Sequence, residues 1–327
     1  MRKNDLQIAN FVCTFGPNAD LIDYLEEIVI PAFFTDTLIR KYGDTSFYVY
    51  EPKWIELGVD GKKELAIVGR FVKDTLLKRE QIIKNNTLVE DYEEMQSTPS
   101  AFFMLILGDH RLLYFGETSA APDLNAFAST MQIYLRRVWR VHLQKMHDQA
   151  VEKITHKDLK RLHPMPTLNI VPVAKNDQID KLMQGFERIE KIRFRLIRPN
   201  HETDASAVFQ SVRDRLQPLK PSRLDVEIAD SDGLEKQESI SAVKEATSGL
   251  NTDVIVTGVD GDGNRIKADN DEFALKIPIE NPPEEKLALA KTLYAEFMKQ
   301  VSSGAVKRFT PNQAVIDKIN ALKALIL

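Results

Sequence analysis

The chain has 327 residues, of which 43% are hydrophobic and 28% are charged, and its formal net charge is -4 at pH 7. This length can bury one large core or two ordinary ones, and it favours two domains. The N-terminal segment lacks a basic stretch followed by an apolar core, and no run approaches about 18 consecutive apolar residues, so we expect neither secretion nor a membrane span.

The first half of the chain predicts strands and helices that do not alternate strictly, which is typical of an α+β fold. Its single cysteine, Cys13, lies in the first predicted strand and excludes internal disulfides and cysteine-rich zinc sites. We expect Cys13 to be a buried, small apolar residue in a cytoplasmic protein. The elements expected here are a strand at 6–15, a helix at 20–34, a hairpin of strands 46–57 and 64–71, a helix at 73–84, a hairpin of strands 101–107 and 112–115, and a long helix at 123–147.

A domain boundary is expected just before residue 167, because Pro164 and Pro166 force an extended backbone ahead of a new apolar strand. The pattern predicts two α+β domains, each with a mixed sheet, and a C-terminal helix. The divisions are an N-terminal domain at 1–152, a basic linker at 153–166, a C-terminal domain at 167–309 and a helix at 310–327. The second domain is expected to contain strands at 167–173, 189–198 and 223–229, helices at 177–186, 204–217, 239–249 and 283–302, and a hairpin at 253–279.

The C-terminal helix is predicted to begin with a capping box between Thr310 and Gln313, with Pro311 at the first helical position. An apolar seam then repeats at intervals of four and three residues. We favour docking of this seam onto its own domain, with a dimer contact as the alternative. The seam consists of Val315, Ile319, Leu322 and Ile326.

Positive charge is concentrated between Arg136 and His163, where eight Lys or Arg residues accompany three acids, whereas residues 1–135 carry 13 basic and 20 acidic side chains. A local basic field of this kind attracts a polyanion, and contact with roughly four to six phosphates would give a log-log salt slope of about -4 to -5. The alternative is a solvated face that pairs with the acidic residues 90–94. The candidate phosphate contacts are Arg136, Arg137, Arg140, Lys145, Lys153, Lys157, Lys160 and Arg161.

A second basic group alternates along one predicted strand and consists of Lys191, Arg193 and Arg195. This strand face could lie against DNA, but the carboxylates of the strand at 223–229 alternate in the same way. Cross-strand ion pairs between the two strands are therefore the favoured interpretation. No sequence-reading motif is present, so any DNA binding should be indifferent to sequence, and the nearby Tyr134 and Trp139 are expected in the core.

Three fragments resemble parts of enzyme or metal sites only weakly. Asp44, Glu51 and Lys53 resemble the acids and lysine of metal-dependent nucleases, which makes such a nuclease the least favoured alternative function. The run 260–264 resembles a calcium loop but favours a hairpin tip, because Arg265 replaces the required glycine. The histidines, including His110, are expected at the surface, and we predict no catalytic residue, cofactor, metal or small-molecule substrate.

Two blocks of the chain resemble the RexA-type phage-exclusion proteins and, more faintly, the RdgC recombination-associated proteins of bacteria. The blocks are 101–127, with the sequence AFFMLILGDHRLLYFG at its start, and 254–301, which includes the turn DGDGNR. The resemblance implies a two-domain, cytoplasmic homodimer that binds double-stranded DNA with little sequence preference in anti-phage defence, in some systems beside a membrane protein. The alternative function is a non-enzymatic interaction subunit for a protein or membrane-associated partner.

Overall fold

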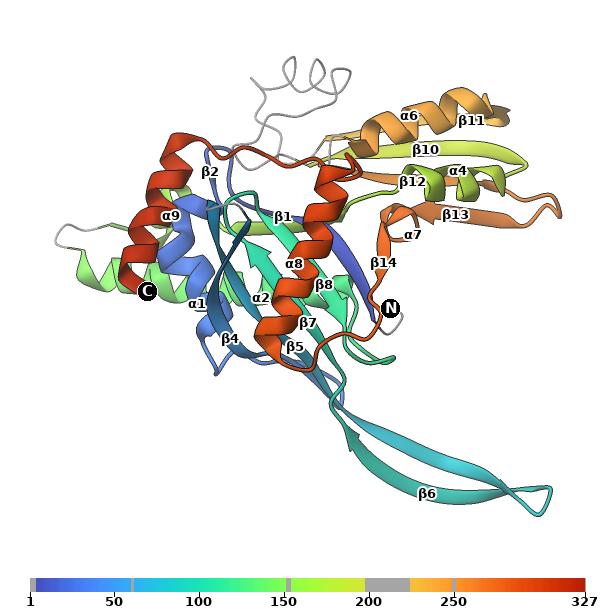
Figure 1. Ribbon diagram of the computed structural model, residues 1–327, viewed down its shortest axis with the longest axis horizontal. Coiled ribbons are helices and arrows are strands. Elements are labelled where there is room, and N and C mark those ends of the chain that lie inside the picture. Colours follow the sequence, from blue (N-terminus) through green and yellow to red (C-terminus); the bar gives the residue numbers. More distant parts are fainter. Residues whose placement is uncertain (1–3, 60–61, 151–153, 198–223, 249–250, 327) are drawn as a thin grey trace.

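The computed structural model describes residues 4–59, 62–150, 154–197, 224–248 and 251–326. It contains two antiparallel sheets with helices packed on them, so the expected α+β class is confirmed (Figure 1). Among the described residues, no helix combines the length and apolar character needed to cross a bilayer. The expected helix at 204–217 lies outside the described residues, as does Lys153.

The larger sheet is built around β1 and has the order β14-β1-β8-β7-β5-β4-β3, with β2 and β9 also paired to β1 and β6 paired to β5. Its strands form mostly by hairpins, which is how antiparallel neighbours are joined by short turns. The bounds are β1 Asp5–Phe15, β2 Ala19–Asp20, β3 Arg40–Tyr42, β4 Thr45–Val59, β5 Lys62–Lys84, β6 Thr87–Ser97, β7 Ser100–Ile106, β8 Arg111–Gly116, β9 Pro166–Pro172 and β14 Lys276–Pro278.

Both faces of this sheet are buried, because successive side chains of a strand point to opposite sides. In β7, Phe103 and Leu105 lie in one apolar cluster, and Phe102 and Met104 lie in another. The first cluster is covered by helices on one face and the second by α8 on the other face (Figure 1). The covering helices are η1 Leu21–Tyr24, η2 Leu25–Val29, α1 Ile30–Phe34, α2 Leu124–Gln149, α3 His156–Leu162, α8 Lys286–Ser302 and α9 Gln313–Ile326.

The smaller sheet has the order β11-β10-β12-β13 and buries one face beneath α4 and α6. Alternation is plain in β12, where Val254 and Val256 are fully buried and their neighbours Asp253 and Ile255 are partly exposed. A short helix, α7, leads from this sheet back to β14. The bounds are α4 Asn176–Gln184, β10 Arg188–Leu196, β11 Leu224–Leu234, α6 Lys236–Ser248, β12 Thr252–Val259, β13 Arg265–Asp269 and α7 Asn270–Phe273.

The expected domain boundaries do not separate the two sheets, and this part of the prediction is corrected. β9, expected to open the second domain, pairs with β1, with Cys13 opposite Leu168. β14 pairs with the other end of β1, where Leu6 lies opposite Ile277. The larger sheet therefore takes strands from both sides of residue 166, because the long strand β1 offers β9 a partner along its C-terminal half.

Three local predictions also differ from the structure. The expected helix at 73–84 is the outer half of β5, because its residues pair with β6. The expected helix at 20–34 is a succession of 3-10, π and α segments. The last helix starts later than predicted, because Asn312 rather than Thr310 caps it, with its Oδ1 accepting from the backbone N–H of Val315 at 3.0 Å.

The C-terminal helix docks onto its own chain, but onto the core built mainly from the first half of the sequence and not onto the domain that precedes it. Val315, Ile319 and Leu322 are buried within the core between the larger sheet and α2, and Ile326 packs at its edge. A buried polar group also ties the preceding segment to the sheet: the Arg111 guanidinium donates to the Asn10 side chain and to a backbone carbonyl in that segment. The end of the chain is thus part of the first core.

Candidate nucleic-acid interface

α2 has one buried face and one charged face, as its sequence predicts. Its apolar side chains, including Phe127, Leu135 and Leu143, are buried against the larger sheet. Arg137, Arg140 and Lys145 are exposed, and at about 100° per residue they lie within an arc of about 140° around the helix. A rise of 1.5 Å per residue spreads them over about 12 Å along the helix axis.

α3 packs beside the C-terminal half of α2 and doubles the basic surface. Its Leu159 is buried in the first core. The rings of His147 and His156 stack with centroids 4.1 Å apart, and Trp139 Nε1 donates to the carbonyl of His163 at 2.9 Å. These contacts fix α3 against α2, so the exposed residues Lys157, Lys160 and Arg161 extend the same basic surface.

Most of these cations are not neutralised by acids. Within the described part of the chain, no carboxylate lies within ion-pair distance of Arg140, Lys145, Lys157 or Lys160. The expected alternative, pairing with residues 90–94, is not seen, because Asp91 and Glu93 pair with Arg79 and Glu94 lies 3.9 Å from Lys78, within the β5–β6 hairpin. We call the surface formed by Arg137, Arg140, Lys145, Lys157, Lys160 and Arg161 the α2–α3 basic surface.

Three candidate residues contribute less than expected. Arg136 is half-buried, and its Nε is enclosed without a hydrogen bond among the described residues. Arg137 donates to the carbonyl of Ile39 at 2.8 Å, and Arg161 lies 3.6 Å from Asp158. Arg137 and Arg161 both stay exposed, so they remain available to a ligand.

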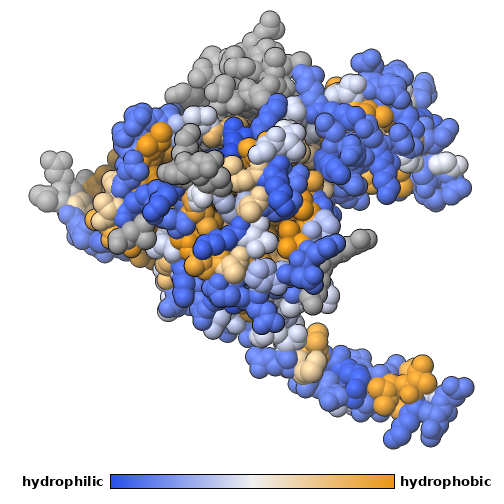
Figure 2. Space-filling view, in the orientation of Figure 1, coloured by the Kyte–Doolittle hydropathy of each residue, from blue (hydrophilic) through white to orange (hydrophobic). Residues whose placement is uncertain are grey.

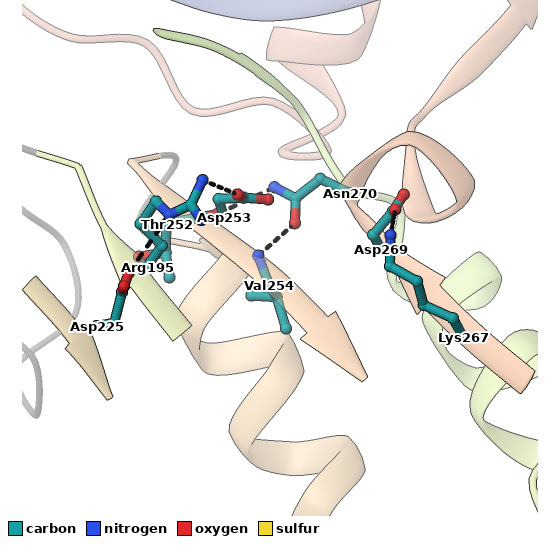
Figure 3. A network of polar contacts seen from close by, with 8 residues as sticks. All are labelled: Arg195, Asp225, Thr252, Asp253, Val254, Lys267, Asp269 and Asn270. Atoms are coloured by element: carbon teal, nitrogen blue, oxygen red, sulfur yellow. Dashed lines mark hydrogen bonds and ion pairs between the residues drawn. The ribbon is translucent and has the colours of Figure 1, made fainter. Parts of the chain in front are cut away.

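The second basic group is largely neutralised, which agrees with the favoured interpretation. Lys191 lies 3.1 Å from Glu227, and Arg195 lies 3.3 Å from both Asp225 and Asp253 (Figure 3). Burial raises the pKa of Asp253, and the Arg195 guanidinium opposes that rise. Arg193 is half-buried, with its Nε enclosed. This strand face therefore offers little free positive charge to DNA.

Beside these pairs, Asn270 joins α7 to the small sheet. Its Oδ1 accepts from Val254 N at 2.7 Å, and its Nδ2 donates to the Thr252 carbonyl at 3.0 Å (Figure 3). Lys267 is paired with Asp269 at 2.7 Å in the same region. The polar contacts here hold the elements together.

The nuclease-like residues do not converge. Asp44 precedes β4 and lies 3.1 Å from Lys78, whereas Glu51 pairs with Lys286 of α8. Since a strand rises about 3.3 Å per residue, the seven steps from Asp44 to Glu51 separate the two residues by roughly 20 Å, too far to share a metal ion. In the ranges that the structure describes, no cluster of His, Cys, Asp and Glu could hold a metal.

The other single-residue predictions have mixed outcomes. Cys13 is fully buried, and burial raises the pKa of its thiol, as expected for a small apolar residue. The calcium-like run forms the β12–β13 turn, in which Asp260 Oδ1 accepts from the backbone N–H groups of Asp262 and Asn264. Surface histidines were expected, but His110 is buried and His163 is half-buried.

A lysine-lined region between the sheets was not predicted from the sequence. Cavities of about 500 and 650 Å³ share Lys175 and Lys276, and the second also contains Lys181. Lys175 precedes α4 and Lys181 lies within it, whereas Lys276 is in β14, so no local charge run marks the three lysines. Lys175 lies 3.5 Å from Asp177, which reduces the positive charge available there.

A family model described as a domain of unknown function, DUF4747, matches residues 144–296. The match begins within α2, includes α3 and the small sheet, and ends within α8. It covers the part of the α2–α3 basic surface that starts at Lys145. No curated protein matches the chain.

Proposed function

We propose that this protein binds double-stranded DNA with little sequence preference through the α2–α3 basic surface. The observation that carries the proposal is the set of four exposed cations without an acidic partner in the described chain: Arg140, Lys145, Lys157 and Lys160. Lysine and arginine side chains that are free of carboxylates can replace the counterions of a phosphate backbone, and this exchange supplies most of the affinity in non-specific binding.

The arrangement also suits a duplex. The exposed cations come from two packed helices, so they form a surface rather than a single line, and phosphates of both strands can contact it. Tyr134 and Trp139 are buried in the core, so base stacking of the kind used for single strands has no exposed aromatic on this surface.

The setting of this binding is proposed from the resemblance to phage-exclusion proteins. It would place the chain in the bacterial cytoplasm, in defence against phage. A DNA-binding role needs no catalytic group, and the nuclease alternative lacks a shared metal site in the described residues.

The test is fluorescence anisotropy with a random-sequence duplex over a salt series. Arg140→Gln/Lys145→Gln should weaken binding and reduce the magnitude of the salt slope by about 2, since each lost phosphate contact removes about 1. The matched control is Lys181→Gln/Lys291→Gln, which removes two exposed helical cations from α4 and α8. Equal effects of the two double variants, or no binding by the wild type at low salt, would contradict the proposal.

A further inference from the structure

The outer half of β5 and the whole of β6 form a two-stranded arm that projects from the body of the molecule (Figure 1). Cα pairing continues from Thr75 opposite Ser97 to Lys84 opposite Thr87, and most residues of β6 are exposed. An isolated two-stranded ribbon is marginally stable in water without a covered apolar face. The arm therefore has the character of an element that is completed by a partner.

One face of the arm carries two exposed apolar pairs. Leu77 lies opposite Met95 near the base, and Ile83 lies opposite Leu88 near the tip. These four side chains are 48%, 61%, 75% and 60% exposed, respectively. They share a face because residues 77, 79, 81 and 83 alternate with the other side of β5, and the extra residue of the irregularity between Arg79 and Gln81 lies in β6, where the partners are Glu93 and Glu90. Figure 2 shows hydrophobic residues gathered toward the outer end of the arm.

Between the apolar pairs the same face is polar. Arg79 lies opposite Glu93, and Gln81 lies opposite Glu90. Arg79 pairs with Asp91 and Glu93, whereas no cation lies within ion-pair distance of Glu90 in the described part of the chain. From base to tip, this face therefore carries an apolar pair, an ion pair, an unpaired carboxylate and a second apolar pair.

We propose that this face binds the same face of a second copy, with the two arms antiparallel about a two-fold axis near residue 80. Leu77 and Ile83 are each three residues, roughly 10 Å, from that axis, so the base pair of one arm covers the tip pair of the other. The same symmetry brings Arg79 of one copy opposite Gln81 of the other, and the unpaired Glu90 is the cross-strand neighbour of that Gln81. An isologous interface needs this kind of self-complementary pattern, and an unrelated partner does not.

The contact is independent of DNA binding, since the arm carries none of the α2–α3 basic surface. Two ribbon faces alone are smaller than the roughly 1,200–2,000 Å² of a stable protein interface, so the dimer should dissociate on dilution. Sedimentation velocity over a concentration series measures this equilibrium. The full-length protein should pass from monomer to dimer, and a monomer at every concentration would overturn the inference.

Two variant pairs locate the interface. Ile83→Glu should abolish the dimer, whereas Leu325→Glu, which changes a 73% exposed leucine of α9, should leave it intact. The reverse result would place the contact on the C-terminal helix and would refute the arm as the dimer interface. Glu90→Arg should raise the dissociation constant about tenfold or more by setting it against Arg79 of the other copy. Glu80→Arg, on the opposite face, should not, and equal effects would also refute the arrangement.

Discussion

The Nε of Arg308 lies 2.7 Å from Oδ2 of Asp109, and the Asp109 side chain is completely buried. The same guanidinium reaches Glu64 at the start of β5. Burial raises the pKa of Asp109 and the two arginines nearby, Arg308 and Arg111, oppose that rise. Residue 109 is in the β7–β8 turn, so this ion pair fastens the segment between α8 and α9 to the larger sheet.

Arg308→Ala should destabilise the protein by about 3–5 kcal/mol, because it leaves the buried carboxylate of Asp109 without its partner. Urea unfolding followed by circular dichroism measures the change. Lys299→Ala is the control, since its pair with Glu296 is exposed and such pairs contribute about 0–1 kcal/mol. Similar losses for the two variants would show that Asp109 does not depend on Arg308.

Stability should fall as the pH is lowered below about 6.5, the ordinary pKa of histidine. Burial and the neighbouring His142 lower the pKa of His163, and its Nδ1 lies 2.8 Å from the Tyr24 hydroxyl. The unfolded chain therefore takes up a proton at a higher pH than the folded chain, so stability is lost between the two pKa values as the pH falls. Thermal unfolding from pH 7.5 to 5 should show a smaller loss for His163→Gln, and an identical profile would contradict this assignment.

The two basic groups should behave differently toward DNA. Lys145→Gln should reduce the magnitude of the salt slope by about 1, because Lys145 has no acidic partner among the described residues. Lys191→Gln should leave the slope unchanged, because Glu227 already neutralises Lys191 at 3.1 Å. Anisotropy titrations of both variants against one duplex make the comparison, and a larger change for Lys191→Gln would move the interface to the small sheet.

Local patterns predicted the elements whose periodicity matches their burial. The continuous apolar run of β7, which buries Phe102 and Phe103 on opposite faces of the sheet, and the two faces of α2 both follow directly from their sequences. Residues 73–84 misled the prediction, because this charged stretch resembles a solvated helix and only its pairing with β6 makes it a strand. The pairing of β9 with β1 likewise joins segments that are far apart in the sequence, and no local pattern indicates it.

The candidate site shows the same division. The density of Lys and Arg predicted that Lys145 and Lys157 lie on a basic surface, because an amphipathic helix exposes the face opposite its apolar one. Whether a cation is free depends on its spatial neighbours, and no local pattern identifies the neighbours of the α2 cations. For β10 the sequence did predict the pair. Cations alternate along β10 and carboxylates alternate along β11, and the register of the two strands sets Arg195 opposite Asp225.

Leu322→Ala should cost about 2–5 kcal/mol in the free energy of unfolding, because Leu322 is 3% exposed and packs in the core beneath α9. Leu325→Ala, three residues away on the same helix, should change it by less than about 0.5 kcal/mol, because this side chain is 73% exposed. Urea unfolding at a protein concentration low enough to keep the chain monomeric distinguishes burial within one chain from burial between two. A loss at Leu322 that appears only at high concentration would mean that the helix docks on a second copy instead.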